Sequence, residues 1–149
     1  MNKMVLIKPW QEAQIDAYFV RKSVFIQEQG VPEAIELDEF DAQAQHALAY
    51  RESQCVGTGR LVTLNSKEGR IGRMAVLKNN RGQGIGRQLL QTLILLGKDQ
   101  DLTTLVLHAQ LDAISFYEQF GFVAIGKIYD EAGIAHRDMI LNTLTQSKN

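Results

Sequence analysis

The sequence predicts a mixed α/β fold, with a central, mostly antiparallel sheet and helices on both of its faces. Three apolar segments separated only by short turns, residues 45–50, 55–64 and 70–77, indicate an antiparallel meander. The segment 70–109 instead reads strand, helix, strand, which requires one right-handed parallel crossover. Because the chain has 149 residues, we expect a single domain spanning residues 1–149.

The N-terminal elements follow from apolar spacing and proline positions. MVLIK (residues 4–8) predicts a short first strand, stopped by Pro9. Residues 10–29 have apolar side chains at helical spacing, with a second helix or turn expected around residues 24–26. The polar and acidic stretch GVPEAIELDEFDAQ (30–43) is predicted to be a loop, and the meander follows it.

The C-terminal elements are bounded by glycines. Leucines and isoleucines at helical spacing after a glycine-rich turn predict an amphipathic helix that ends near Gly97. Residues 103–109 are rich in β-branched and apolar types and predict a strand. Asp112 is a suitable N-cap for a short helix closed by Gly121. A last antiparallel pair is predicted at residues 122–129 and 136–142.

Composition excludes several classes of protein. Hydrophobic residues make up 45% and charged residues 22%, and the formal net charge is −1, so no broad basic face favours nucleic acid. No apolar run is long enough for a membrane span and no signal peptide is recognisable, so we expect a cytoplasmic protein without a membrane partner. Cys55 is the only cysteine, and the three histidines have no metal-ligand spacing, so no metal is expected.

The glycine-rich turn in NNRGQGIGRQLL (residues 79–90) is the strongest functional signal. Glycines before a helix let the backbone approach an anion, which the free N–H groups and the dipole of the helix then bind. The stretch lacks the GK[ST] ending of a P-loop, and it fails the dinucleotide fingerprint because Arg87 or Leu89 stands where the third glycine should be.

Arg81-x-x-Gly84-x-Gly86 resembles the acyl-CoA pyrophosphate loop of the GNAT superfamily of N-acyltransferases. A second family pattern, Asn-x-x-Ala-x-x-Phe-Tyr followed by Gly-Phe, is matched downstream with Gln in place of Asn. Its positions are Gln110, Ala113, Phe116, Tyr117, Gly121 and Phe122. The segments VFIQEQGVPEAIELDEFD (24–41) and YEQFGF…YDEAGIAHRDM (117–139) further resemble the ElaA/YjcF type of GNAT protein.

The resemblance implies a GNAT-type fold and transfer of an acetyl group from acetyl-CoA to a primary amine by direct attack in a ternary complex. The acceptor would be a small-molecule or peptide amine, and a homodimer is left open. The residues that would bind acetyl-CoA are Met74, Ala75, Val76, Arg81, Gly82, Gln83, Gly84, Ile85, Gly86, Arg87, Gln110 and Phe116. For Arg87, a position on a solvated helix face is the alternative.

Tyr117 matches the family position that stabilises the departing thiolate, although its spacing also suits the apolar face of a helix. A lysine-like amine must lose a proton before it attacks, so a base is needed. Glu28 and His136 lead because they lie in the segments that resemble the subgroup. Glu36, Asp38, Asp41 and His108 are the other candidates, each with an ordinary structural role as its alternative. Cys55 lacks a base partner and is interpreted as a packed thiol.

Two other functions remain open from the sequence. Acyl-homoserine-lactone synthases share this fold, and the residues here that resemble their characteristic set are Arg21, Phe25, Glu36, Asp38, Asp41 and Arg60. The short chain and the pyrophosphate loop favour acetyl-CoA over an acyl carrier protein as donor. The third reading is a non-catalytic CoA-binding module that has kept the fold without turnover.

Overall fold

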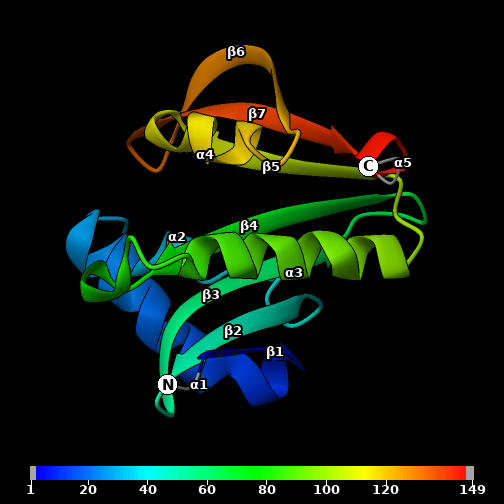
Figure 1. The fold of residues 1–149 in the computed structure, drawn as a ribbon. Helices are drawn as coiled ribbons and strands as arrows, with labels where there is room; N and C mark the ends of the chain where they lie inside the picture. The colour runs from blue at the N-terminus through cyan, green and yellow to red at the C-terminus, as the bar shows by residue number, and fades with distance from the viewer. Residues whose placement is uncertain (1–2, 147–149) are drawn as a thin grey trace.

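The computed structural model describes residues 3–146, which form one seven-stranded sheet with the strand order β1-β2-β3-β4-β5-β7-β6 (Figure 1). The strands are β1 (Lys3–Pro9), β2 (Gln45–Arg51), β3 (Gln54–Thr63), β4 (Glu68–Val76), β5 (Thr104–Gln110), β6 (Val123–Glu131) and β7 (Ile134–Asn142). The helical segments are α1 (Trp10–Arg21), η1 (Lys22–Glu28), α2 (Glu33–Glu36), η2 (Lys78–Asn80), α3 (Ile85–Asp99), η3 (Leu111–Ala113), α4 (Ile114–Glu118) and α5 (Thr143–Gln146).

The pairing of the strands confirms the predicted mixed α/β architecture. β1 to β4 form an antiparallel meander, and β5, β7 and β6 form a second antiparallel group. The two groups meet only through β4 and β5, which run parallel and pair along Glu68–Arg70 and Thr104–Val106. Beyond these residues the two strands separate toward their C-terminal ends, which opens the sheet on one side (Figure 1).

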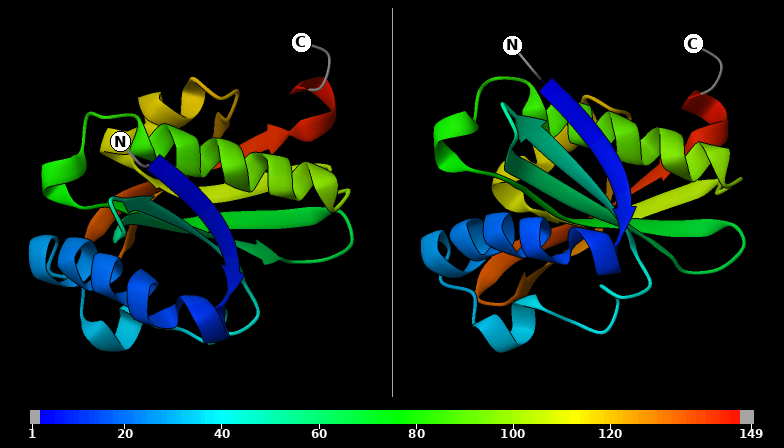
Figure 2. Two further views of the ribbon diagram at one scale, coloured as in Figure 1. Left: turned by 60° about the horizontal axis from the view of Figure 1, so that its bottom comes forward. Right: turned by 90° about the horizontal axis from the view of Figure 1, so that it is seen from below.

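Helices cover both faces of the sheet, as the sequence predicts (Figure 2). α3 packs its buried leucines against one face, where Leu89, Leu93 and Leu105 belong to the larger core. α1 covers the other face through Ala13, Ala17 and Val20, which pack with Leu48 of β2 in a smaller core. The two faces of the sheet are therefore covered by different helices, α3 on one face and α1 on the other.

The segment before β2 is more structured than the sequence indicates. α1 continues directly into the π-helical turns of η1, where the N–H of Gln29 donates to the carbonyl of Val24 at 3.0 Å. Residues 30–43 were expected to be a loop, but they contain the four-residue helix α2. The chain here folds over the sheet and is held by buried charges described below.

The predicted helix cap at Asp112 is wrong. Asp112 lies inside the 3₁₀ turn η3, and α4 begins only after Ala113, whose side chain makes no capping hydrogen bond. A 3₁₀ turn ahead of the helix shifts the cap position by one residue, from Asp112 to Ala113, so residue 112 does not face the first free N–H groups of α4.

Candidate functional site

The glycine turn ends in an exposed helix N-terminus. Gly82 and Gly84 have φ values of 77° and 82°, in the left-handed region that favours glycine. A Cβ added at either position would meet no atom within 4 Å, so the space beside this backbone is open. α3 begins at Ile85 without a side-chain cap, which leaves the N–H groups of its first turn available to an anion.

Arg81 connects this turn to the rest of the fold. Its Nε donates to the carbonyl oxygen of Val76 at 2.9 Å, and its two Nη atoms each donate to a carboxylate oxygen of Glu28 at 2.7 Å. The hydrogen bonds from Arg81 hold the pKa of Glu28 below its ordinary value. Glu28 is therefore a weak base, and it fixes η1 to the glycine turn.

The beginning of α3 also contacts α4. A side chain at Gly86 would meet Phe116 Cζ at 3.7 Å and Val76 Cγ2 at 3.9 Å, so this turn lies against both β4 and α4. The guanidinium of exposed Arg87 lies 4.9 Å from the ring centre of Phe120 and donates to Gln119. Arg87 thus packs against the residues that follow α4, at the edge of the glycine turn.

A cavity of about 490 Å³ lies where β4 and β5 separate. Its walls come from η1, the segment 36–40, β3, β4, β5, α4 and the β6–β7 hairpin. Met74, Gln110, Tyr117 and His136 of the sequence-predicted site all line it. Gln110 is positioned there by Gln29, whose side-chain oxygen accepts its amide at 3.0 Å.

Tyr117 packs on the apolar side of α4, as its spacing suggests, and it also borders the cavity. Its ring packs edge-on against Phe116 and Phe122, with ring centres 5.2 and 6.0 Å apart, and the residue also lines the cavity. Its hydroxyl makes no hydrogen bond to any other described residue, and burial raises the pKa of Tyr117 to about 12. The side chain therefore brings a neutral hydroxyl to the cavity wall.

Of the two leading base candidates, His136 lines the cavity and Glu28 does not. His136 is 6% exposed, stacks on Tyr129, and hydrogen-bonds through Nδ1 to the carbonyl oxygen of Ile134 at 2.7 Å. Because a carbonyl oxygen only accepts, Nδ1 carries the proton. Nε2 has no partner among the described residues, so the neutral ring keeps a lone pair there.

The remaining candidates have structural partners. His108 is exposed at the cavity rim, where its Nδ1 lies 3.1 Å from a carboxylate oxygen of Glu131. Cys55 is buried and burial raises the pKa of its thiol to about 12, so it is the packed thiol that the sequence predicts. Glu36, Asp38 and Asp41 belong to the ion cluster described next.

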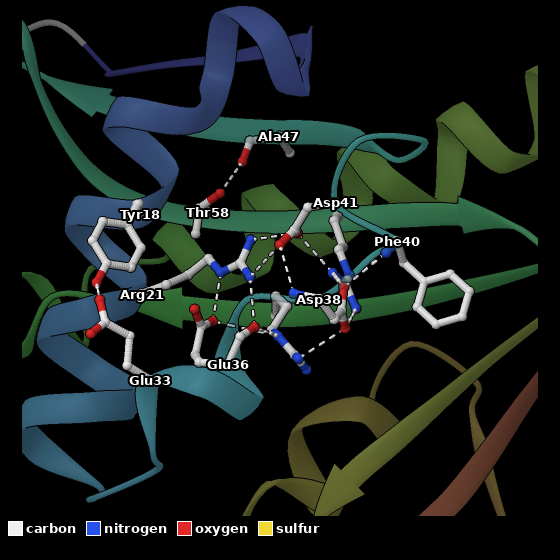
Figure 3. Close-up of polar contacts among 11 residues, drawn as sticks. Tyr18, Arg21, Glu33, Glu36, Asp38, Phe40, Asp41, Ala47 and Thr58 are labelled. Atoms are coloured by element: carbon white, nitrogen blue, oxygen red, sulfur yellow. Dashed lines mark hydrogen bonds and ion pairs between the residues drawn. The ribbon is translucent and has the colours of Figure 1, made fainter.

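Six charged side chains form an ion cluster that joins the segment 36–41 to the rest of the fold (Figure 3). Its members are three arginines and three carboxylates: Arg21, Arg60, Arg73, Glu36, Asp38 and Asp41. Arg21 binds Glu36 at 2.6 Å and Asp41 at 2.8 Å, and Arg60 binds Asp41 at 2.7 Å. The cluster fastens the segment to α1, β3 and β4.

The cluster lowers the pKa values of Asp38 and Asp41 in spite of burial. Burial alone would raise the pKa of Asp41, but the hydrogen bonds and charge of Arg21, with Arg60, lower it overall. The pKa of Asp38 is lowered in the same way, mainly through Arg60. Glu36 Oε1 is the one buried side-chain N or O atom without a hydrogen-bond partner in the part of the chain that the structure describes.

Sequence reasoning missed three residues that shape the cavity: Phe40, Arg70 and Gly72. Arg70 and Gly72 stand two positions apart on β4, so they face the same side of the sheet. The alternation in EGRIGR (residues 68–73) indicates that Arg70 and Gly72 share a face of β4. The sequence does not reveal which face of β4 the rest of the chain leaves uncovered.

Residues 3–146 contain neither a candidate metal site nor a candidate membrane-spanning helix. These residues contain no group of three or more side chains arranged to hold a metal ion. None of the described helices is long and apolar enough to cross a membrane.

The sheet opens beside an uncapped helix N-terminus, and Tyr117 lines the cavity at this opening. Residues 10–143 match the acetyltransferase (GNAT) domain family, and the chain belongs to this family.

Similar proteins include members of the ElaA/YjcF type that the sequence resembles. The chain is 32% identical to the uncharacterized N-acetyltransferase YjcF of Bacillus subtilis, over 93% of this chain and 98% of that one. It is 30% identical to the protein ElaA of Escherichia coli, over 80% of this chain and 81% of that one. These matches confirm the resemblance to the ElaA/YjcF type.

Solved structures share the fold. A crystal structure of an acyl-CoA N-acyltransferase from Pseudomonas aeruginosa superposes with a TM-score of 0.84 at 27% identity, covering 93% of this chain and 99% of that one. The CoA-dependent acyl-homoserine lactone synthase BjaI superposes with a TM-score of 0.79 at 15% identity, covering 98% and 86%. The second likeness shows a common fold alone.

Proposed function

We propose that the protein transfers an acetyl group from acetyl-CoA to a primary amine by direct attack in a ternary complex. The observation that carries the proposal is that the anion-binding turn, the opening between β4 and β5, and Tyr117 adjoin one another. A pyrophosphate at the start of α3 would direct the rest of CoA toward this opening and bring its thioester to the cavity.

Each part of the turn has its own task in binding CoA. The N–H groups of residues 82–87 bind the pyrophosphate, with charge from Arg87, while Arg81 supports the turn from behind through Val76 and Glu28. Met74, Ala75 and Val76 present backbone groups to the pantetheine arm, and an N–H of this strand polarises the thioester carbonyl. Gln110 and Phe116 complete the wall on the side of α4.

Tyr117 stabilises the departing thiolate by a hydrogen bond. A pKa of about 12 lies well above that of a thiol, near 8.5, so complete proton transfer is uphill by roughly 5 kcal/mol. A hydrogen bond without full transfer avoids most of this cost. The buried position of the ring in turn keeps the hydroxyl neutral throughout the physiological pH range.

His136 accepts the proton of the amine, directly or through water. The lone pair on Nε2, the position in the cavity and the fixed Nδ1–H support this assignment over Glu28. Glu28 does not line the cavity and its carboxylate is bound by Arg81, so its proposed task is to hold the glycine turn.

The acceptor is a small-molecule or peptide amine, and we propose a single-domain cytoplasmic enzyme without nucleic-acid, membrane or metal partners. The activity is tested by mixing acetyl-CoA with a panel of primary amines and following the release of CoA thiol, with acetylated product identified by mass spectrometry. Size-exclusion chromatography with light scattering distinguishes a monomer from a homodimer. Calorimetric titration of CoA tests the donor site separately.

An acyl-homoserine-lactone-synthase-like activity is less well supported. The residues that resemble that set, apart from Phe25, are engaged with one another in the ion cluster, which gives them a structural role. A preference for acylated acyl carrier protein over acetyl-CoA would favour the synthase-like activity. Because the synthase BjaI is itself CoA-dependent, S-adenosylmethionine is assayed as acceptor beside ordinary primary amines to separate the two activities with a CoA donor. Binding of CoA without transfer to any amine would instead indicate a non-catalytic CoA-binding module.

A further inference from the structure

The cavity contains three arginines, and two of them are already neutralised. Arg60 donates to Asp38 and Asp41 at 2.7–2.9 Å, and Arg73 binds Asp38 at 3.1 Å. Arg70 lies on the same cavity wall, but none of the described carboxylates is within ion-pair distance of it. The cavity therefore holds one guanidinium whose charge is not matched by a neighbouring carboxylate.

Arg70 is held in place without using its hydrogen-bond donors. Its guanidinium carbon lies 4.9 Å from the ring centre of Phe40, which also lines the cavity. A cation–π contact of this kind orients the side chain and leaves its five N–H groups for a ligand. A planar guanidinium in this state suits an oxyanion, which it binds through two parallel hydrogen bonds.

Gly72 keeps the cavity wall next to Arg70 open. A Cβ added at this position would meet nothing within 4 Å, and its φ lies outside the left-handed region. Neither backbone conformation nor crowding by the protein therefore requires glycine here. Since Gly72 lines the cavity, a side chain at this position would occupy space that a ligand can use.

We propose that the acceptor amine carries an oxyanion, a carboxylate or a phosphate, which binds Arg70 above Gly72. This inference rests on the proposed acetyl transfer. Arg70 stands four positions before Met74 on β4, which is at most about 13 Å along the strand because Arg73, with a φ of 52°, interrupts the extended backbone. The long arginine side chain covers part of that distance, so the oxyanion and the amine are separated by several bonds, as in an ω-amino acid.

Matched pairs of amines test the proposal, because each pair differs in the oxyanion. We compare kcat/KM for γ-aminobutyrate against propylamine, and for phosphoethanolamine against ethanolamine. The wild-type protein is expected to favour the anionic member of at least one pair by tenfold or more, since hydrogen bonds to charged groups are strong. The pair with the larger ratio distinguishes a carboxylate from a phosphate.

Two substitutions locate the effect. Arg70→Gln should remove the preference for the anionic amine, chiefly through its KM, while the rate with the neutral amine and the KM of acetyl-CoA stay within twofold of wild type. Arg70→Lys should restore part of the preference, because the charge returns without the planar donors. Arg137→Gln is the matched control, since Arg137 donates to the carbonyl of Gly126 on β6 and does not line the cavity.

Gly72→Val supplies a readout that does not depend on the charge of Arg70. It should weaken binding of γ-aminobutyrate or phosphoethanolamine to the CoA-saturated protein by tenfold or more in calorimetry, with CoA affinity unchanged.

Equal kcat/KM within both pairs, or a preference that survives Arg70→Gln, would overturn the inference and leave the proposed function intact. If no amine of any kind is acetylated, the proposed function itself fails.

Discussion

Tyr117 and His136 line one cavity from different elements, and the proposed mechanism divides the chemistry between them. Tyr117 comes from α4, and burial of its ring keeps its hydroxyl protonated. His136 comes from β7, where the carbonyl of Ile134 fixes the tautomer of the ring. The two side chains therefore suit opposite tasks: one donates a hydrogen bond to a leaving group and the other accepts a proton.

Tyr117→Phe removes the hydroxyl and keeps the ring that packs against Phe116 and Phe122. We expect turnover to fall on the order of 10²-fold or more, with little change in CoA affinity, because only the developing thiolate loses a partner. Steady-state kinetics and calorimetry with CoA measure the two quantities. Tyr50→Phe is the control, since that hydroxyl binds Asp16 outside the cavity. Unchanged turnover in Tyr117→Phe would remove the assigned role.

His136→Gln and Glu28→Gln separate the two base candidates. Loss of a general base costs typically 10²–10⁴-fold, and the loss shrinks at high pH where the amine deprotonates without help. We therefore expect His136→Gln to lower kcat/KM near neutral pH and to recover in alkaline buffer. Glu28→Gln should weaken CoA binding and keep the shape of the pH–rate profile. The opposite pattern, a changed profile in Glu28→Gln alone, would reassign the base.

At the scale of elements, the glycine turn and α3 form one unit whose position depends on β4, η1 and α4. Arg81 binds Val76 and Glu28, and Gly86 lies against Phe116. The unit is thus held from three sides, so the free N–H groups of α3 keep their direction before any ligand binds.

Gly84→Ala tests whether the turn binds an anion. A non-glycine residue at a φ of 82° costs roughly 1–2 kcal/mol of folding free energy, and the added methyl group stands beside the N–H groups of α3. We expect CoA affinity to fall at least tenfold in calorimetry. Gly126→Ala is the matched control, because Gly126 has a φ of 75° and equal open space on β6. Equal CoA affinities in the two variants, at equal loss of stability, would contradict the assignment.

The elements show how far the sequence alone could predict the structure. Period-two and helical patterns identified all seven strands and the long helices α1 and α3. They indicated a helix or turn at residues 24–26, where η1 lies, although not its π-helical form, and they did not identify α2. The segment that contains α2 is held by long-range contacts such as the pairs of Arg21 with Glu36 and Asp41. Such contacts have no local signature in the chain.

The sequence indicates residues of the candidate site only where a short motif is present. Gly84, Gly86 and Tyr117 fall in motifs with fixed spacing, and the fold brings them to one opening. Arg70 and Gly72 belong to no motif, and their role depends on which face of β4 the segment 36–41 leaves uncovered. That information is three-dimensional, so sequence patterns could not supply it.

At the scale of the molecule, charge balance in the ion cluster sets the response to acid. Burial raises the pKa values of Asp38 and Asp41 in the folded protein, but contacts with arginines outweigh it, so both pKa values are lowered overall. Burial lowers the pKa of His46. In each group the unfolded chain binds protons more readily than the folded one. The resulting stability is present at neutral pH and is lost as the pH falls.

The loss should occur in two windows. The contribution of His46 decreases as the pH falls below about 6.5, and those of Asp38 and Asp41 decrease below about 4, the pKa values of the unfolded chain. Urea unfolding at a series of pH values measures both. His46→Gln should remove the first decrease and Asp38→Asn should reduce the second. A free energy of unfolding that stays constant from pH 7 to pH 3 would contradict this account.

The three-residue parallel ladder between β4 and β5 leaves the molecule with a seam. On one side of the seam the sheet consists of the meander β1 to β4, and on the other of β5, β7 and β6. A ligand bound between β4 and β5 would therefore connect the two groups of strands where they do not pair. Under the proposed function, binding of the donor there raises the free energy of unfolding with the logarithm of donor concentration over its dissociation constant. Hydrogen exchange of the backbone amides along the unpaired edges of β4 and β5 should slow when the donor is bound. The exchange rate at the seam therefore measures the fraction of protein that has the donor bound.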